Sequence, residues 1–474
     1  MRTRGFAPAA PRSLPTDSGS GDENKYPAEM SNRALIKSRL ASVMHLLTGN
    51  FGIAGIMLLS MSLAARSLGP AQFGAMALVL ATGRVSERLL RFEAWQPLIR
   101  FVAAEEEGAS PHRLARLYAY GLMLDVASAV LAAILSVVFG IVAGSAIGLQ
   151  PDQIGLVAIY ACAIALNIRG MSSAALRMSG KFRTLAYIQL AGGLLRLVLA
   201  LVLYLNGAGL RDFIIVWTVA QIFDALLFNI IGFRTLHQRA IPNPLRVSWL
   251  GLPSQFPGFL RFAFSTNLSS TMRTLTHEAD TLLVGFFAGP GAAGLYHLSR
   301  RIAKVAQQSG DMIQTVIYPD LARMWAAMKL ARVKKMVRWV QIAMAGFGVA
   351  ALVAIGILGK PLLGMLFGES YVAAWPLLMT QVVAVTLLLH AAPSRSALLA
   401  MNRPTYVLGV AFASTVIFFA VALYALPQFG AIGANYAHIA FGLTTAICLD
   451  LALWFQFRHH QAGQIPELAR GEDQ

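Results

Sequence analysis

The chain consists mainly of long apolar runs that are separated by short polar segments. Twelve runs reach about 20 residues, the length that an α-helix needs to cross the hydrocarbon core of a bilayer. They lie at about 43–65, 71–99, 117–142, 153–176, 184–205, 212–232, 260–287, 291–320, 337–359, 374–398, 405–426 and 431–457. The pattern predicts an all-α polytopic membrane protein with about 12 transmembrane helices.

Basic residues fall unequally on the two sides of these predicted spans. With the N-terminus in the cytoplasm, most Lys and Arg residues lie on cytoplasmic segments, and the external loops carry only Arg66, Arg211 and Lys360. Cytoplasmic loops of membrane proteins carry the excess of Lys and Arg. The distribution therefore predicts an even number of spans with both termini cytoplasmic.

The composition excludes most soluble functions. Apolar residues make up 57% of the 474 residues and charged residues 13%. A soluble enzyme of this length needs a larger share of charged and polar residues to cover its surface. In a soluble protein the net charge of +17 would suggest a nucleic-acid partner, but loop orientation accounts for most of it. No nucleic acid is expected. Cys162 and Cys448 both lie inside apolar runs, so neither a disulfide framework nor a metal site is expected.

Polar segments divide the chain into five parts. The first residues lack the apolar core of a secretory signal, and the segment near the middle of the chain is rich in proline. The predicted parts are a disordered cytoplasmic tail (1–40), an N-terminal six-helix lobe (41–232), a cytoplasmic linker (233–258), a C-terminal six-helix lobe (259–458) and a cytoplasmic tail (459–474).

The two halves carry an internal repeat. The motif Gly-Pro-x-x-x-Gly occurs at 69–74, between spans 1 and 2, and again 220 residues later at 289–294, between spans 7 and 8. Weaker matches at offsets of 222 and 223 residues pair 175–176 with 397–398, Lys181 with Arg403 and 207–208 with 430–431. Because each half has an even number of spans, the lobes should be related by a pseudo-two-fold axis along the membrane normal.

Charged side chains inside the predicted spans mark a candidate site. A charge at the bilayer centre costs at least about 2.5–3.5 kcal/mol, so each must face a cavity, a partner or water. Arg84 and Lys304, which the repeat pairs, lie about 20 Å below the external turns at 1.5 Å per residue. Both lobes would then supply cations to one cavity that suits an anion such as a phosphate. The candidate substrate-binding cations are Arg84, Arg196, Arg273, Arg300 and Lys304.

Each group also has an alternative role. Arg84, Arg273 and Lys304 could instead pair with Asp224, Glu278 or Asp280. Candidates for Na⁺ or proton coupling are His277, Glu278 and Asp280. Arg88 and Arg91 could form ion pairs within their own helix together with Glu87 and Glu93, or these residues could snorkel to the cytoplasmic interface. Interhelical hydrogen bonds are the preferred role for Asp125, His390 and Asp450.

Templates for catalysis are missing from the sequence. There is no Gly-rich nucleotide loop ending in Gly-Lys-Ser/Thr, no HExxH and no GxSxG, and the predicted external loops are too short for a catalytic domain. We therefore expect no enzyme and no cofactor. Energy for transport would come from an ion gradient, the membrane potential or the gradient of the substrate.

Several motifs resemble the polysaccharide (oligosaccharide-lipid) flippases of the multidrug/oligosaccharidyl-lipid/polysaccharide exporter superfamily. In the second half these are Asp280–Gly285, Gly294–Tyr296, Tyr318–Arg323, Leu366–Leu378 and Gly430–Ala434. In the first half they are Leu68–Gly74, Arg100–Val102, Ala175–Arg177 and Gly180–Phe182. The resemblance covers about residues 40–460. The charge-rich segment Arg84–Glu93 departs from many relatives.

The resemblance implies a V-shaped two-lobed bundle with a cationic central cavity in a bacterial inner membrane. The implied cargo is a polyprenyl-pyrophosphate-linked oligosaccharide, moved from the cytoplasmic to the periplasmic leaflet by alternating access for exopolysaccharide, capsule or O-antigen assembly. The implied partners are this lipid-linked oligosaccharide, the bilayer, a polysaccharide polymerase and a chain-length regulator. The alternatives are a peptidoglycan-precursor flippase, a drug/cation antiporter or a non-transporting assembly protein.

Overall fold

A computed structural model describes residues 32–468, apart from 93, 106–107, 109 and 275. Residues 1–31 and 469–474 of the predicted tails therefore lie outside the described residues. The chain divides into a short unit, Met1–His45, and a large one, Leu46–Gln474. All of the packing and the site described below lie within the large unit.

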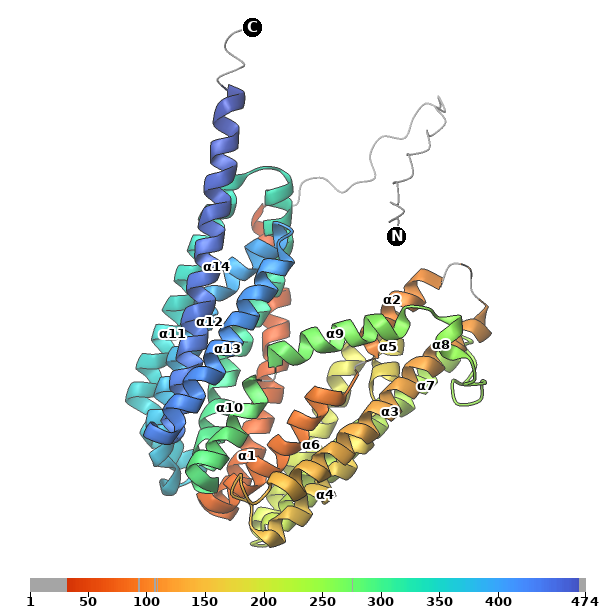
Figure 1. The fold of residues 1–474 in the computed structure, drawn as a ribbon, viewed down its shortest axis with the longest axis vertical. Helices are drawn as coiled ribbons and strands as arrows, with labels where there is room; N and C mark the ends of the chain where they lie inside the picture. Colours follow the sequence, from red (N-terminus) through yellow and green to blue (C-terminus); the bar gives the residue numbers. More distant parts are fainter. Residues whose placement is uncertain (1–31, 93, 106–107, 109, 275, 469–474) are drawn as a thin grey trace, which may run out of the picture. The chain divides into compact units, whose positions relative to one another are not determined.

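Within the described ranges the fold is helical throughout (Figure 1). The first half contains α1 (Asn32–Leu90), α2 (Trp95–Glu105), α3 (Pro111–Ala143), α4 (Pro151–Ala165), α5 (Gly170–Met178), α6 (Phe182–Leu205) and α7 (Leu210–Gln238). The segment after α7 contains α8 (Leu252–Gln255). The second half contains α9 (Phe259–Thr274), α10 (Thr276–Ala326), α11 (Leu330–Phe367), the 3₁₀ turn η1 (Glu369–Ala374), α12 (Trp375–Ala400), α13 (Pro404–Phe429) and α14 (Ala431–Leu468).

The predicted spans are present, and four of them are joined in pairs as two helical hairpins. Ten helical segments of the described chain are long and apolar enough to cross a membrane. Two of the ten contain a glycine with positive φ that breaks a merged helix: Gly69 (φ 68°) in α1 and Gly289 (φ 81°) in α10. Each glycine separates two predicted spans, so the ten segments correspond to about twelve crossings in two lobes. We call the end of the bundle at which Gly69 and Gly289 lie the hairpin end. The end that carries residues 239–258 is called the linker end.

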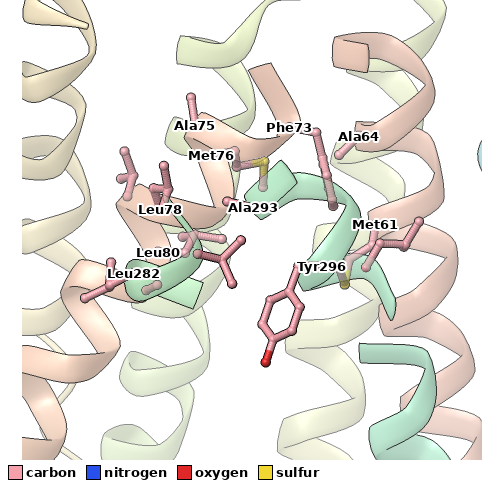
Figure 2. Packing of buried hydrophobic residues seen from close by; sticks show 14 of the residues in the cluster. Met61, Ala64, Phe73, Ala75, Met76, Leu78, Leu80, Leu282, Ala293 and Tyr296 are labelled. Carbon is pink, nitrogen blue, oxygen red and sulfur yellow. The ribbon is translucent and has the colours of Figure 1, made fainter. Parts of the chain in front are cut away.

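Four apolar cores hold the described helices together, the smallest of them between α5, α6 and α7. The largest contains residues of both lobes, including Phe73 and Val79 of α1 and Tyr296 and Phe367 of the second half. Figure 2 shows part of it, with Met76, Leu78 and Leu80 beside Ala293 and Tyr296. The second core joins α2, α3 and α5 to α8 and α9, and the third joins α10, α11, α12 and α14. The lobes therefore share a core near the hairpin end, and near the linker end α9 of the second half packs into a core with α2, α3 and α5 of the first half.

The two hairpins meet in a reciprocal contact that shows the repeat in three dimensions. A Cβ atom built at Gly294 would lie 2.5 Å from the carbonyl oxygen of Pro70. One built at Gly74 would overlap the carbonyl group of Pro290. The second glycine of each motif thus contacts the proline of the other motif, as in an interface across a two-fold axis. The backbones approach this closely only because both positions are glycine.

One of the weaker repeat matches also adopts a matching backbone conformation. Gly180 and Asn402, which are 222 residues apart, have φ angles of 67° and 58°. In both places the next amide donates a hydrogen bond of 2.9 Å to the carbonyl five residues before it, which is the Schellman pattern at a helix end. Gly207 and Gly430 share only the positive φ, 63° and 62°, since the amide after Gly207 donates to the Leu203 carbonyl whereas Gly430 has a ψ of −145°. The predicted duplication is therefore visible in the turns at Gly180 and Asn402.

Hydrogen bonds between the lobes reinforce the hairpin end. Arg66 of α1 donates from Nε to the Leu366 carbonyl at 2.8 Å and from Nη2 to the Met365 carbonyl. The Tyr371 hydroxyl donates to the Ala65 carbonyl at 3.0 Å. Since Arg66 and Ala65 belong to the first half and the other three to the second, these bonds hold the two lobes together at this end.

Two predicted spans are interrupted, which corrects the expected continuous helices 71–99 and 153–176. The helix of span 2 ends at Leu90 and resumes at Trp95, and that of span 4 ends at Ala165 and resumes at Gly170. Backbone groups freed inside a membrane need other partners. The carboxylate of Asp125 accepts the amides of Ala94 at 3.2 Å and Met171 at 2.8 Å. The predicted interhelical role of Asp125 is confirmed.

Span 7 also differs from the prediction of one helix over 260–287. Its residues belong to α9 and to the first part of α10. The α9 part contains a polar run that includes Thr266, Asn267 and Thr271. The α9 helix packs instead against α2 and α13, and Phe259 at its start stacks on Tyr120 with ring centroids 4.6 Å apart.

Candidate functional site

An ion pair between the lobes forms the centre of the candidate site. Arg84, on the α1 helix after the Gly69 turn, donates from Nε to Oε2 of Glu278 on α10 at 2.7 Å. Their side chains are 18% and 14% exposed. Arg84 was expected to face a cavity or to pair with one of Asp224, Glu278 and Asp280, and it pairs with Glu278. The bond places the span 2 cation against the second half of the chain.

Cations outnumber anions around this pair. Glu278 interacts electrostatically with Arg84, Arg300, Arg301 and Lys304. Among the described residues Arg301 and Lys304 form no salt bridge, and the closest polar contact of Arg301 is its Nε, 3.4 Å from Nε2 of His297. Lys304 is exposed. One carboxylate is therefore surrounded by cations from both lobes, with net positive charge left over.

Asp280 lies two residues from Glu278 but belongs to a different environment. Its side chain is fully buried, and Oδ2 accepts hydrogen bonds from the Tyr296 hydroxyl and from Nε2 of His438, each at 2.9 Å. It also forms an ion pair with Arg300. Asp280 and Arg300 thus neutralise each other inside the C-terminal lobe. His438 was not singled out from the sequence, because nothing near it in α14 suggested a partner.

The predicted coupling group is only partly described. Glu278 and Asp280 have different arginine partners, so the structure does not bring these two carboxylates to one shared ligand position. The side chains of His277 and of Arg273, a predicted substrate-binding cation, lie outside the described residues. Within the described chain no group of three or more His, Cys, Asp or Glu side chains could hold a metal ion.

The cations of spans 4 and 5 form a second group in the N-terminal lobe. Arg169 forms an ion pair with Asp224 at 2.6 Å. Arg196 places its guanidinium 5.7 Å from the ring centroid of Trp217 and, in the part of the chain described, makes no salt bridge. Asp224, an alternative partner for Arg84, is therefore used by Arg169. Arg196 keeps its charge available.

Residues near the break in span 2 line a small polar pocket. Arg91 pairs with Glu87 at 3.2 Å, as predicted for ion pairs within this helix, and donates to the Asn167 carbonyl at 2.6 Å. Thr271 Oγ1 donates to the Arg88 carbonyl at 2.5 Å and so ties α9 to α1. The pocket is lined by Glu87, Arg88, Arg91, Gln96, Thr266, Asn267 and Thr271. The three α9 residues were missed because that helix was interpreted as an ordinary apolar span.

The arrangement suits a ligand that carries more than one negative charge. Guanidinium groups bind phosphate oxygens in pairs, and Lys304 adds a point charge on the same helix as Arg301. Charges in membrane proteins that face a bundle interior without a partner mark substrate pathways. Carboxylate, amide and hydroxyl groups next to them can hydrogen-bond a polar ligand.

A two-lobed helical bundle with hairpins crossing at one end and unpaired cations between its halves defines a class, the multi-pass membrane transporters. The sequence matches the family described as "Polysaccharide biosynthesis protein" over residues 63–376. This is more than half of the chain, and the chain belongs to that family.

Two curated proteins are similar in sequence. The inner membrane protein YghQ of Escherichia coli strain K12 is 23% identical over 328 residues, which cover 68% of this chain and 90% of YghQ. The probable flippase AglR of Haloferax volcanii is 26% identical over 258 residues, which cover 52% of this chain and 49% of AglR. The chain thus spans most of YghQ and about half of AglR.

Solved structures share the fold. A lipid II flippase, MurJ, in an inward closed conformation gives a TM-score of 0.66 at 14% identity, covering 86% of this chain and 87% of MurJ. An inward-facing multidrug transporter of the MATE family, from the MOP superfamily, gives 0.63 at 13% identity, covering 90% and 98%. The expected fold class is confirmed. Those similar proteins whose names state an activity are flippases or transporters. This agrees with the expectation from the sequence that the protein is not an enzyme.

Proposed function

We propose that the protein moves a polyprenyl-diphosphate-linked oligosaccharide from the cytoplasmic to the periplasmic leaflet of the inner membrane. The observation that carries the proposal is the excess of cations between the lobes, with Glu278 as their shared carboxylate. A diphosphate between Arg84, Arg301 and Lys304 would neutralise charge contributed by both halves of the bundle.

The position of the cations supports alternating access. Arg84 and Lys304 each follow their hairpin glycine by 15 residues, which places them about 20 Å from the hairpin end at 1.5 Å per residue. The core shared by the lobes and the bonds of Arg66 close the hairpin end. With both termini cytoplasmic, as the basic residues predict, the site in this conformation is reached from the cytoplasm.

The polar pocket supports a saccharide on the same lipid. Its lining offers the amides of Gln96 and Asn267 and the hydroxyls of Thr266 and Thr271, beside the charged groups of α1. Such groups form the hydrogen bonds that sugar hydroxyls require when water is removed. The proposed cargo serves exopolysaccharide, capsule or O-antigen (lipopolysaccharide) assembly, with a polysaccharide polymerase and a chain-length regulator as partners.

The test is leaflet exposure of the lipid-linked glycan in cells with Arg84→Ala or Lys304→Ala. Lys335→Ala, an exposed cation on α11 outside the site, is the matched control, and membrane expression is checked for each variant. We expect the glycan to accumulate on the cytoplasmic leaflet in the two site variants and not in the control. Normal periplasmic exposure in well-expressed site variants would refute the proposal.

Other cargoes of the superfamily give different results. A peptidoglycan-precursor flippase would stop cell-wall synthesis on depletion while surface polymer persisted. A drug/cation antiporter needs an anionic cavity, whereas here Glu278 lies among the cations Arg84, Arg301 and Lys304. Such an antiporter would lower the accumulation of a cationic dye, and we expect expression of this protein to leave dye accumulation unchanged.

A further inference from the structure

The C-terminal lobe contains a large apolar pocket that the cationic site does not use. It encloses about 380 Å³ between α10, α12, α13 and α14, within the range of about 300–1,000 Å³ typical of ligand sites. Its walls are mainly aliphatic, with Leu389, Leu399, Val407 and Phe441 among them. Leu408 on its rim is 44% exposed, so the pocket is open on the α13 side.

The pocket lies beside the cations on the same helix. Gln307 and Gly310 form its α10 wall. Residues three apart on a helix are neighbours on one face, so Gln307 lies one turn beyond Lys304, toward the linker end. The lining also contains Arg395 of α12. A ligand with an anionic head at Lys304 would therefore have its hydrocarbon part at the pocket.

The repeat shows that this apolar character belongs to one lobe only. At the 222-residue offset, Leu389 corresponds to Asn167 and Ala391 to Arg169. In the N-terminal lobe those positions carry polar contacts: Asn167 donates to Glu87 at 2.8 Å, and Arg169 pairs with Asp224 at 2.6 Å. The same place in the two halves is thus polar in one and apolar in the other.

We propose that this pocket binds the isoprenoid segment next to the diphosphate of the transported lipid, with the diphosphate at Lys304. The inference rests on the proposed function. It assigns the two parts of the cargo to different pockets, the hydrocarbon to the apolar pocket of the C-terminal lobe and the saccharide to the small polar pocket near the break in span 2. The charge of Lys304 complements an anionic head, and the open rim at Leu408 lets a long chain continue into the bilayer.

Photolabelling of the full-length protein in nanodiscs tests the pocket directly. The probe is a polyprenyl diphosphate without sugar that carries a diazirine on the isoprene unit nearest the diphosphate, and labelled peptides are identified by mass spectrometry. A phosphatidylethanolamine with a diazirine on its acyl chain is the probe for bulk lipid. The variants are Ala411→Phe, which fills the pocket from α13, and Ala413→Phe, which adds the same ring to an exposed position of α13.

We expect the wild type to be labelled on α12 and α13 residues of the pocket by the diphosphate probe alone. Ala411→Phe should lower this labelling about tenfold, the lower part of the range for steric discrimination in an apolar pocket. Ala413→Phe should leave it unchanged, and Lys304→Gln should reduce it. Equal labelling by both probes, or label spread over lipid-facing helices of the wild type, would overturn the inference.

Translocation is measured in parallel so that the two proposals fail separately. Wild-type translocation of lipid-linked glycan combined with label outside the pocket would refute the pocket assignment and leave the proposed function standing. Pocket labelling without any translocation of the glycan would refute the proposed function and show that the pocket binds isoprenoid diphosphates for another purpose.

Discussion

Replacing Gly74 by alanine tests whether the lobes touch through the hairpin crossing. A Cβ atom at this position would overlap the carbonyl group of Pro290 and lie 3.0 Å from the amide nitrogen of Gly294. The obstructing atoms are backbone atoms, which cannot rotate away as a side chain can, so the hairpins must separate. Overpacking of this kind typically costs about 1–3 kcal/mol.

This cost applies only to conformations in which the crossing is closed. If the lobes separate here during transport, a penalty of about 1–3 kcal/mol changes the ratio of closed to open states by about 5–150-fold. Spin labels at Asn206→Cys and Phe429→Cys, one at a hairpin-end turn of each lobe, report that ratio in a background with Cys162 and Cys448 replaced by serine. We expect Gly74→Ala to move the distance distribution to longer values.

Two other glycines of the hairpins separate steric overlap from backbone strain. Gly291→Ala has no atom within 4 Å of its new Cβ and should keep the wild-type distances. Gly69→Ala also has free space, but its φ of 68° is unfavourable for alanine, so it should lower the free energy of unfolding by about 1–2 kcal/mol. A wild-type distance distribution in Gly74→Ala would refute the close crossing.

Three further variants test other parts of the structure through thermal unfolding of monodisperse protein in detergent. Glu278→Gln leaves Arg84 mostly buried without its carboxylate and should destabilise the protein by about 3–5 kcal/mol. Adding Arg84→Gln should recover part of this loss, and an additive double variant would contradict the pairing. Asp125→Ala removes the acceptor of two buried amides and should cost about 1–3 kcal/mol for each, whereas no measurable loss would mean that other groups satisfy the break. Gly180→Asn and Asn402→Gly should each change stability by less than about 0.5 kcal/mol, because both residues tolerate the positive φ that the repeat requires, and a large loss would show that the two turns are not equivalent.

The parts of the fold set by local rules were predictable from the sequence. Gly69 and Gly289 mark the reversals because a helix cannot continue through a residue with extended ψ and positive φ, and the proline that follows starts the next helix. The apolar runs located the spans, because length and hydropathy are properties of a segment alone.

The interruptions of spans 2 and 4 depend on distant residues and were not predictable in this way. The break after Leu90 is stable because Asp125, on another helix, accepts the Ala94 amide. A hydropathy window across 71–99 contains no sign of that partner. The same holds for the apolar pocket, which exists only because α12 and α13 pack against α14 rather than closely against each other.

The role of each charge in the candidate site follows from helical geometry together with the packing of the lobes. Glu278 and Asp280 are two residues apart on α10, so their side chains point about 200° apart around the helix axis. Sequence analysis grouped them as one coupling cluster, but only Glu278 can face Arg84 while Asp280 faces Tyr296 and His438 in the C-terminal lobe.

This division has a consequence for the proposed cycle. Because Asp280 compensates Arg300 inside one lobe, Glu278 is the one carboxylate among the described residues that opposes the charge of Arg84, Arg301 and Lys304. Any conformation that brings the lobes closer at the linker end would press like charges together at a depth where water screens them poorly. A bound diphosphate removes that repulsion, so on the proposed function the loaded protein closes the linker end more readily than the empty one. Return of the empty transporter is then the slower half of the cycle, unless protonation or an ion at Glu278 changes the balance.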